Sequence, residues 1–137
     1  MSNGWPVTPD GLRTILLRVG REYPSAPPLV VTENGAAYAD PVGADGRPDL
    51  DDGPRVSYLL DHLEVLDRAV ADGADVRGYF AWSLLDNFEW AEGYTQRFGL
   101  VHVDFTTQER TPRRSYAVYR DAITAQRRRA SEAQSSR

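Results

Sequence analysis

The first group with reactive potential is the carboxylate of Glu33, in the segment Thr32-Glu33-Asn34-Gly35 at the end of a short apolar run. Active sites of parallel α/β proteins gather at the carboxyl ends of strands, where a carboxylate can act as nucleophile, general base or metal ligand. Gly35 allows a sharp exit from the strand, which would leave Glu33 facing a cleft. A strand-terminal Glu serves equally often as a loop cap or ion-pair partner, so this segment alone leaves its role open.

A second segment with chemical potential runs from Trp82 to Trp90 and includes Glu89. A Trp side chain offers a broad apolar face that suits the C–H face of a pyranose ring. The ionised carboxylate of Glu89 has only acceptor oxygens and can receive two adjacent hydroxyls. These side chains together are typical of sugar recognition. The alternative is that both Trp residues belong to the core and Glu89 is a surface charge.

The elements that must position these two segments alternate between helix and strand. Apolar runs predict strands over residues 29–32, 76–84 and 98–103, the first buried on both faces. Capping residues followed by proline predict helices that start at Thr8-Pro9, Asp52 and Thr111-Pro112. The second helix is expected to end at Gly73 and to bury one stripe of apolar side chains: Val56, Leu59, Leu60, Leu63, Leu66 and Val70.

This order predicts an α/β fold with parallel strands, because strands that alternate with helices pair through right-handed crossovers. Both chemical segments then lie at neighbouring strand ends, so Trp82 comes beside Glu33. A complete (β/α)₈ barrel needs about 250 residues. A chain of 137 residues is too short to form one.

The motifs that carry a family resemblance occur in one order along residues 4–124. They are Gly4-Trp5-Pro6, Pro9-Asp10-Gly11-Leu12, Val31-Thr32-Glu33-Asn34-Gly35-Ala36, Arg77-Gly78-Tyr79-Phe80-Ala81 with the nine residues from Trp82, Glu92-Gly93-Tyr94, Arg97-Phe98-Gly99-Leu100, Val103-Asp104 and Arg110-Thr111-Pro112. The sequence resembles the C-terminal part of glycoside hydrolase family 1, the β-glucosidase family. The resemblance implies about two βα units of a TIM barrel plus the preceding helix, not a complete barrel.

The resemblance also implies roles for individual residues. Glu33 would be the catalytic nucleophile of a retaining hydrolase, and Trp82 the aromatic platform under the sugar. Glu89 would accept sugar hydroxyls with Trp90 close by, and Phe98 would help to close the pocket. Glu89-Trp90 favours an unphosphorylated sugar, because a carboxylate there would repel a phosphate. The implied substrate is a β-glucoside or a short β-linked oligosaccharide.

The acid/base half of the family's site is absent from this sequence. Its Glu belongs to an Asn-Glu-Pro motif, which does not occur here, and neither Asp86 nor Glu92 matches it. We therefore expect the chain to be inactive alone. The alternatives are a non-catalytic sugar-binding fragment and an assembly piece that associates with itself or with a missing N-terminal barrel portion.

Composition and charge limit which cofactors, partners and cellular locations we expect. The chain has a net charge of −4 and no cysteine, and His62 and His102 are scattered, so we expect no metal, cofactor or nucleic acid. No apolar run is long enough to span a membrane and the start shows no secretory signal, so we expect a cytoplasmic location. Residues 1–124 are expected to form the barrel portion and the polar residues 125–137 a disordered tail.

Overall fold

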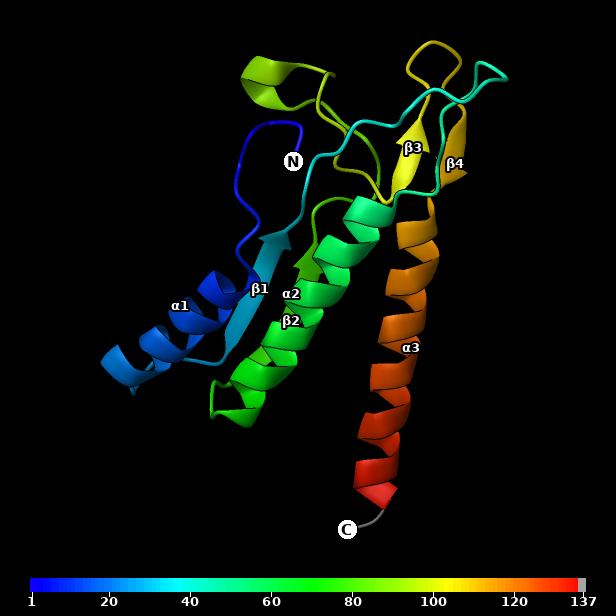
Figure 1. The fold of residues 1–137 in the computed structure, drawn as a ribbon. Helices are drawn as coiled ribbons and strands as arrows, with labels where there is room; N and C mark the ends of the chain where they lie inside the picture. Colours follow the sequence, from blue (N-terminus) through cyan, green and yellow to red (C-terminus); the bar gives the residue numbers. More distant parts are fainter. Residues whose placement is uncertain (136–137) are drawn as a thin grey trace.

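The computed structural model describes residues 1–135 of the chain. Three long helices and two pairs of strands make up the fold (Figure 1). The elements in order are α1 (Pro9–Glu22), β1 (Leu29–Asn34), α2 (Gly53–Ala71), β2 (Val76–Ala81), the 3₁₀ turn η1 (Trp90–Glu92), β3 (Val101–Val103), β4 (Arg110–Pro112) and α3 (Arg114–Ser135). The predicted alternation of helix and strand is confirmed.

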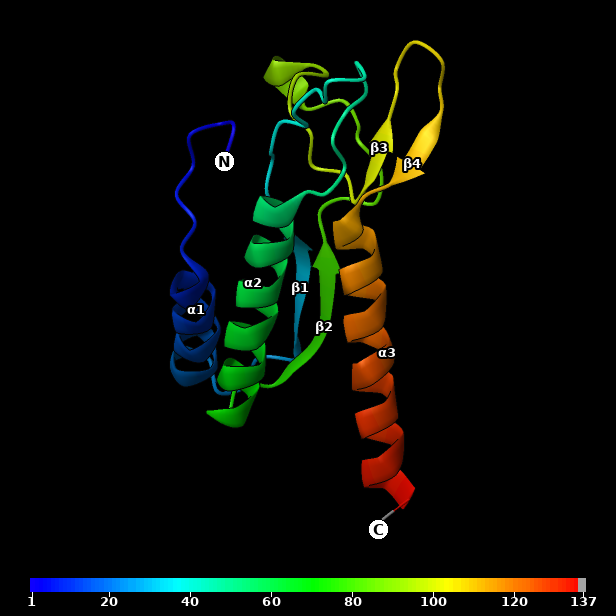
Figure 2. The same ribbon diagram turned by 45° about the vertical axis from the view of Figure 1, so that its right-hand side comes forward.

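The strands β1 and β2 form a two-stranded parallel sheet, in which Val31 pairs with Tyr79 and Asn34 with Ala81. The helix α2 connects them and packs against both α1 and α3 (Figures 1 and 2). The described residues thus form a partial α/β unit and no closed barrel. The carboxyl ends of β1 and β2 lie side by side, as the sequence predicted.

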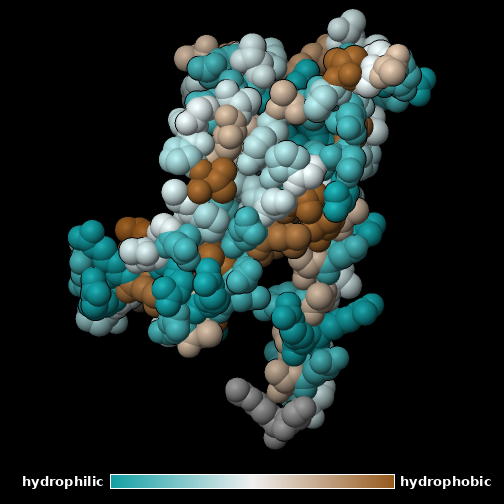
Figure 3. Space-filling view, viewed as in Figure 1, coloured by the Kyte–Doolittle hydropathy of each residue, from teal (hydrophilic) through white to brown (hydrophobic). Residues whose placement is uncertain are grey.

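The first strand was predicted to be buried on both faces, and this is wrong. Leu29 and Val31 are half-buried and pack against the core of Leu16, Ala69 and Ala74, whereas Val30 is 47% exposed. The helices cover only one face of the sheet, so alternate side chains of β1 have no cover. Figure 3 shows apolar residues gathered over the middle of the molecule, and mostly polar residues over the far half of α3.

The helix α2 begins after Asp52 and ends before Gly73, as predicted, but Asp52 makes no side-chain cap. Its carboxylate instead accepts hydrogen bonds from Arg55 and from Ser115 at the start of α3. The predicted apolar stripe is partly wrong, because Leu60 and Val70 are each 47% exposed. The buried face extends toward α1 and consists of Arg55, Val56, Tyr58, Leu59, His62, Val65 and Ala69.

The last third of the chain differs most from the sequence prediction. The second strand ends at Ala81 rather than residue 84, and the third is limited to Val101–Val103. Thr111 and Pro112 do not start a helix but belong to β4, which pairs antiparallel with β3. Pro112 lacks an amide donor, which an edge strand tolerates.

The polar residues from 125 onward, which we expected to be disordered, continue α3 as exposed helix to Ser135. Their Ala, Arg, Gln and Glu side chains favour helix even without burial. Residues 136 and 137 of that expected tail lie outside the described residues. Within residues 1–135, no helix is both long enough and apolar enough to cross a bilayer.

Candidate active site

A cleft with a volume of about 730 Å³ lies at the carboxyl ends of β1 and β2. It brings together every site residue that the sequence analysis named. The carboxyl end of β1 supplies one carboxylate, and the segment after β2 supplies the aromatic side chains and a second carboxylate. The predicted residues that line the cleft are Glu33, Trp82, Glu89, Trp90 and Phe98.

These side chains differ in their exposure to solvent. Glu33 lies within β1 and is exposed, while Trp82 and Glu89 are half-buried. Trp90 is 84% exposed, which excludes the alternative that it is a core residue. Phe98 is 6% exposed and forms part of the floor. The cleft therefore offers accessible carboxylates and an aromatic surface beside the buried Phe98.

A close backbone approach holds the Trp82 segment beside the end of β1. The Trp82 amide donates to the carbonyl oxygen of Asn34 at 2.9 Å. A Cβ atom added to Gly35 would lie 1.7 Å from the carbonyl oxygen of Trp82. The sequence predicted that Gly35 permits a sharp exit from the strand, and the structure shows a different need: only a hydrogen atom fits in this space.

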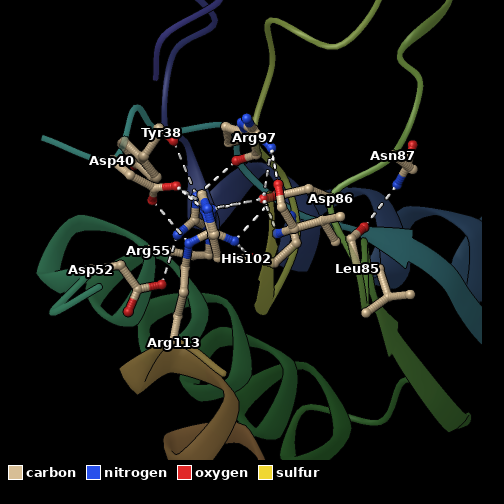
Figure 4. Close-up of polar contacts among 12 residues, drawn as sticks. Tyr38, Asp40, Asp52, Arg55, Leu85, Asp86, Asn87, Arg97, His102 and Arg113 are labelled. Atoms are coloured by element: carbon tan, nitrogen blue, oxygen red, sulfur yellow. Dashed lines mark hydrogen bonds and ion pairs between the residues drawn. The ribbon is translucent and has the colours of Figure 1, made fainter. Parts of the chain in front are cut away.

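Buried ion pairs join the loop after β1 to the loop after β2, which carries Trp82, Glu89, Trp90 and Phe98 (Figure 4). Arg113 is 1% exposed and bonds both Asp40, in the loop after β1, and Asp86, in the loop after β2. Burial alone would raise the pKa of Asp40, but hydrogen bonds from Arg113 and His102 outweigh it and hold that pKa below its usual value. Burial alone would lower the pKa of Arg113, and the two carboxylates raise it instead.

Asp40, Asp86 and His102 place one donor atom each within 4.8 Å of the others, which is the arrangement of a possible metal site. The guanidinium of Arg113 already lies against all three, with 2.9 Å from Nη2 to Asp86 and 3.3 Å to His102 Nδ1. A divalent ion would have to displace this buried cation. Asp86 is 4% exposed, so it is also closed to a role as a catalytic acid.

Several residues line the cleft that the sequence analysis did not assign to the site. Trp5, 63% exposed, precedes α1, and Tyr58 and His62 come from α2. The sequence feature that could have identified Trp5 as a site residue is its place as an aromatic residue directly ahead of a helix. The sequence showed His62 only as one of two scattered histidines. It is 4% exposed and satisfied, because Nδ1–H donates to the carbonyl of Tyr58 at 2.7 Å.

The arrangement suits the chemistry of a sugar ring. An exposed carboxylate at a strand end, an aromatic face beside it and a second carboxylate with two acceptor oxygens can hold and attack a pyranose. Two parallel strands with carboxylates and aromatic side chains at their carboxyl ends suit the class of α/β glycosidases. The comparison with known proteins agrees with that class.

The family model described as Glycosyl hydrolase family 1 matches residues 1–128, and the chain belongs to this family. The bifunctional β-D-glucosidase/β-D-fucosidase of Bifidobacterium breve is 52% identical over 122 residues, which cover 88% of this chain and 26% of that protein. β-Glucosidase A of Thermotoga maritima is 46% identical over 120 residues, again 88% of this chain and 26% of that protein.

Solved structures of β-glucosidases give the same result. The psychrophilic β-glucosidase BglU of Micrococcus antarcticus superposes with a TM-score of 0.82 at 52% identity, over 89% of this chain and 26% of that one. The family 1 β-glucosidase of Thermotoga maritima in complex with isofagomine lactam gives 0.84 at 44% identity, over 90% and 28%. This chain thus spans about a quarter of the length of the relatives it matches.

Proposed function

We propose that this chain is the nucleophile-bearing, C-terminal part of a retaining β-glucosidase barrel, with Glu33 as the nucleophile. The observation that carries the proposal is the single cleft that joins Glu33 to Trp82, Glu89, Trp90 and Phe98. The substrate is a β-glucoside or a short β-linked oligosaccharide. Its glycosyl ring rests on Trp82, its hydroxyls donate to Glu89 beside Trp90, and Phe98 closes the pocket.

In the proposed reaction a Glu33 oxygen forms a bond to the anomeric carbon as the bond to the aglycone oxygen breaks. That oxygen takes a proton from a second carboxylic acid, which then removes a proton from the water that releases the sugar. The two carboxyl groups must lie about 5–5.5 Å apart. The family's Asn-Glu-Pro motif is absent from this sequence, so the chain supplies the nucleophile and lacks the acid.

The chain alone should therefore give no meaningful turnover. A general acid contributes about 10²–10⁴-fold to such reactions, and the missing barrel walls would also orient the substrate. A 2-deoxy-2-fluoro β-glucoside with a very good leaving group needs little of that acid. We expect this reagent to add one fluoroglucosyl mass to the chain, mapped by peptide sequencing to Glu33.

The matched control is Glu33→Gln, which keeps the size of the side chain and removes the nucleophile. Glu33 is exposed and forms no part of the buried core, so the variant should fold. An adduct on another residue, or an equal adduct in Glu33→Gln, would overturn the assignment. Hydrolysis of cellobiose by the pure chain would overturn the expected inactivity.

A second candidate function is sugar binding without chemistry. The 84% exposure of Trp90 at the cleft favours it, because an accessible indole can stack on a sugar whether or not Glu33 reacts. Titration with methyl β-D-glucoside, followed by tryptophan fluorescence, separates the two. Binding that is equal in the wild type and Glu33→Gln, with no adduct in either, would support this second function.

The sugar is proposed to be unphosphorylated. One relative is named a 6-phospho-β-galactosidase and is 44% identical over 117 residues, so the comparisons alone leave this choice open. The Glu89 carboxylate lines the cleft and would repel a second anion. We expect methyl β-D-glucoside to bind more tightly than its 6-phosphate, and Glu89→Gln to reduce the difference. The reverse order of affinities would contradict the proposal.

The exposed apolar face of the sheet indicates which partners this chain would bind. Val30 and Phe80 are 47% and 61% exposed, so the uncovered face of the sheet suits the rest of a barrel or a further copy of this chain. No nucleic-acid or membrane partner is proposed. The cytoplasmic location expected from the sequence stays a prediction, which cell fractionation would test.

A further inference from the structure

Two buried arginines, Arg55 and Arg113, lie where α2 and α3 begin, next to the loops that follow β1 and β2 (Figure 4). Arg55, in the first turn of α2, donates to the carbonyl of Tyr38 at 3.2 Å and to that of Arg97 at 2.7 Å. Tyr38 belongs to the loop after β1, residues 35–52, and Arg97 to the loop after β2, residues 82–100. Arg55 therefore bonds both loops through their backbones.

Arg113, just before α3, bonds the same two loops through their carboxylates. Its Nε donates to Asp40 Oδ1 at 2.9 Å, and Nη2 contacts the other oxygen of Asp40. Nη1 and Nη2 donate to the two oxygens of Asp86 at 3.2 and 2.9 Å. One planar guanidinium thus engages both carboxylates with a fork that a lysine ammonium does not have.

Asp86 passes this constraint to the residues that line the cleft. It lies four residues after Trp82 and three before Glu89. Its Oδ1 accepts the amide of Gly99 at 2.9 Å, and Oδ2 accepts the amide of Val103 at 3.2 Å. Arg113 also donates to the carbonyl of Gly99 at 2.6 Å.

Gly99 directly follows Phe98, whose backbone carbonyl accepts the amide of Ser83 at 3.3 Å. The two ends of the loop after β2 are therefore joined to each other, and through Asp86 and Arg113 to Asp40 in the loop after β1. Arg113 does not line the cleft and cannot touch a sugar there. Its effect on the site therefore acts through Asp86 and through the Gly99 carbonyl.

We propose that Arg113 is a positioning residue of the sugar site: by bonding Asp40 and Asp86 together, it holds the loop of Trp82, Glu89 and Phe98 in fixed relation to Glu33. The part of this inference that concerns sugar rests on the proposed function. The part that concerns the loops does not.

The test compares Arg113→Met, which removes the charge and keeps much of the side-chain length, with Arg114→Met. Arg114 is the next residue, its side chain is 54% exposed, and it forms an ion pair with Asp51 at the surface. Amide hydrogen exchange reports on the loop, since the Gly99 and Val103 amides both donate to Asp86. Amides of the α2 core, such as that of Leu66, report on the global fold.

We expect Arg113→Met to raise the exchange rates of Gly99 and Val103 at least about tenfold, with the Leu66 amide unchanged, and Arg114→Met to match the wild type. The affinity for methyl β-D-glucoside, followed by tryptophan fluorescence, should fall at least about tenfold in Arg113→Met only. Wild-type exchange at Gly99 and Val103 in Arg113→Met would overturn the inference.

Two further outcomes are decided by the same measurements. If the wild type does not respond to the glucoside, the proposed function fails for this chain, and the exchange rates alone still decide whether Arg113 positions the loop. If Arg113→Met is unfolded, Arg113→Lys takes its place, because it keeps the charge and loses the fork. Faster exchange at Gly99 and Val103 in Arg113→Lys supports the inference, and wild-type exchange overturns it.

Discussion

At the scale of single residues, Gly35 limits how closely the two loops of the site can approach. The Trp82 carbonyl occupies the place where a side chain at residue 35 would begin. Any larger residue must push the Trp82 segment away from the end of β1. The aromatic platform and the carboxylate of Glu33 would then separate.

We predict that Gly35→Ala lowers the free energy of unfolding by about 1–3 kcal/mol, the usual cost of overpacking a rigid site. Urea denaturation followed by circular dichroism measures it. The matched control is Gly20→Ala in α1, where an added Cβ meets nothing within 4 Å. That change should raise the free energy of unfolding by about 0.5–1 kcal/mol, because Ala favours helix over Gly. Equal effects of the two variants would contradict this reading of Gly35.

The residue types at the site could be predicted from the sequence because each has a local signal. Glu33 ends an apolar run, and Trp82 and Glu89 stand together in a segment that is too polar for a core. The roles of Asp40 and Arg113 could not be predicted in this way. They lie 73 positions apart and meet only through the tertiary fold. From residue type alone, an aspartate and an arginine are predicted to be ordinary surface charges.

At the scale of elements, periodicity predicted the existence of the main helices and strands better than it predicted their surroundings. The stripe of α2 was predicted from spacing, but the packing of α1 against α2 decides which side is buried. The hairpin of β3 and β4 was missed for a similar reason. Thr111-Pro112 is an acceptable helix start, and pairing with β3 overrides it.

The buried His62 makes the stability of α2 depend on pH. Burial lowers its pKa below 6.5, although the Tyr58 carbonyl and Asp61 oppose that shift. As the pH falls below about 6.5, the unfolded chain binds a proton that the folded chain does not. We expect the free energy of unfolding to decrease as the pH falls from about 7 to about 5. Denaturation curves at each pH should show a smaller decrease in His62→Gln, and parallel curves would contradict the prediction.

The exposed end of α3 should add little to stability. Residues 125–135 are helical but exposed, so removing residues 125–137 should change the free energy of unfolding by less than about 0.5 kcal/mol. Ending the chain before Tyr119 is the contrasting truncation. It removes the bond from the Tyr119 hydroxyl to the Tyr79 carbonyl at 3.2 Å and the contact of the two rings. Comparable losses from both truncations would show that the end of α3 contributes more than its exposure indicates.

At the scale of the whole molecule, the sheet is covered on one face and open on the other. Val30 and Phe80 lie on that open face, and the Val30 side chain lies over Gly78 of the neighbouring strand. Each of the two strands also keeps one edge without a partner among the described residues. Open edges and apolar faces favour association.

We predict that the chain associates as its concentration rises. Sedimentation velocity over about a hundredfold range of concentration should show an increasing average mass, and Phe80→Lys should reduce the increase by placing a charge on the open face. Phe88→Lys is the matched control, because Phe88 is similarly exposed, at 56%, but lies in the loop after β2. A monomer at every concentration would contradict the prediction.

The bonds of Arg55 and Arg113 have a consequence for anyone who wishes to change the sugar preference of such a site. The two loops and the first residues of α2 and α3 form one interdependent unit, since each arginine reaches both loops. If one loop is transplanted alone from a relative, the two arginines no longer find both of their aspartates and both of their backbone carbonyls in place. The transferable module is the pair of loops together with the two helix starts beneath them.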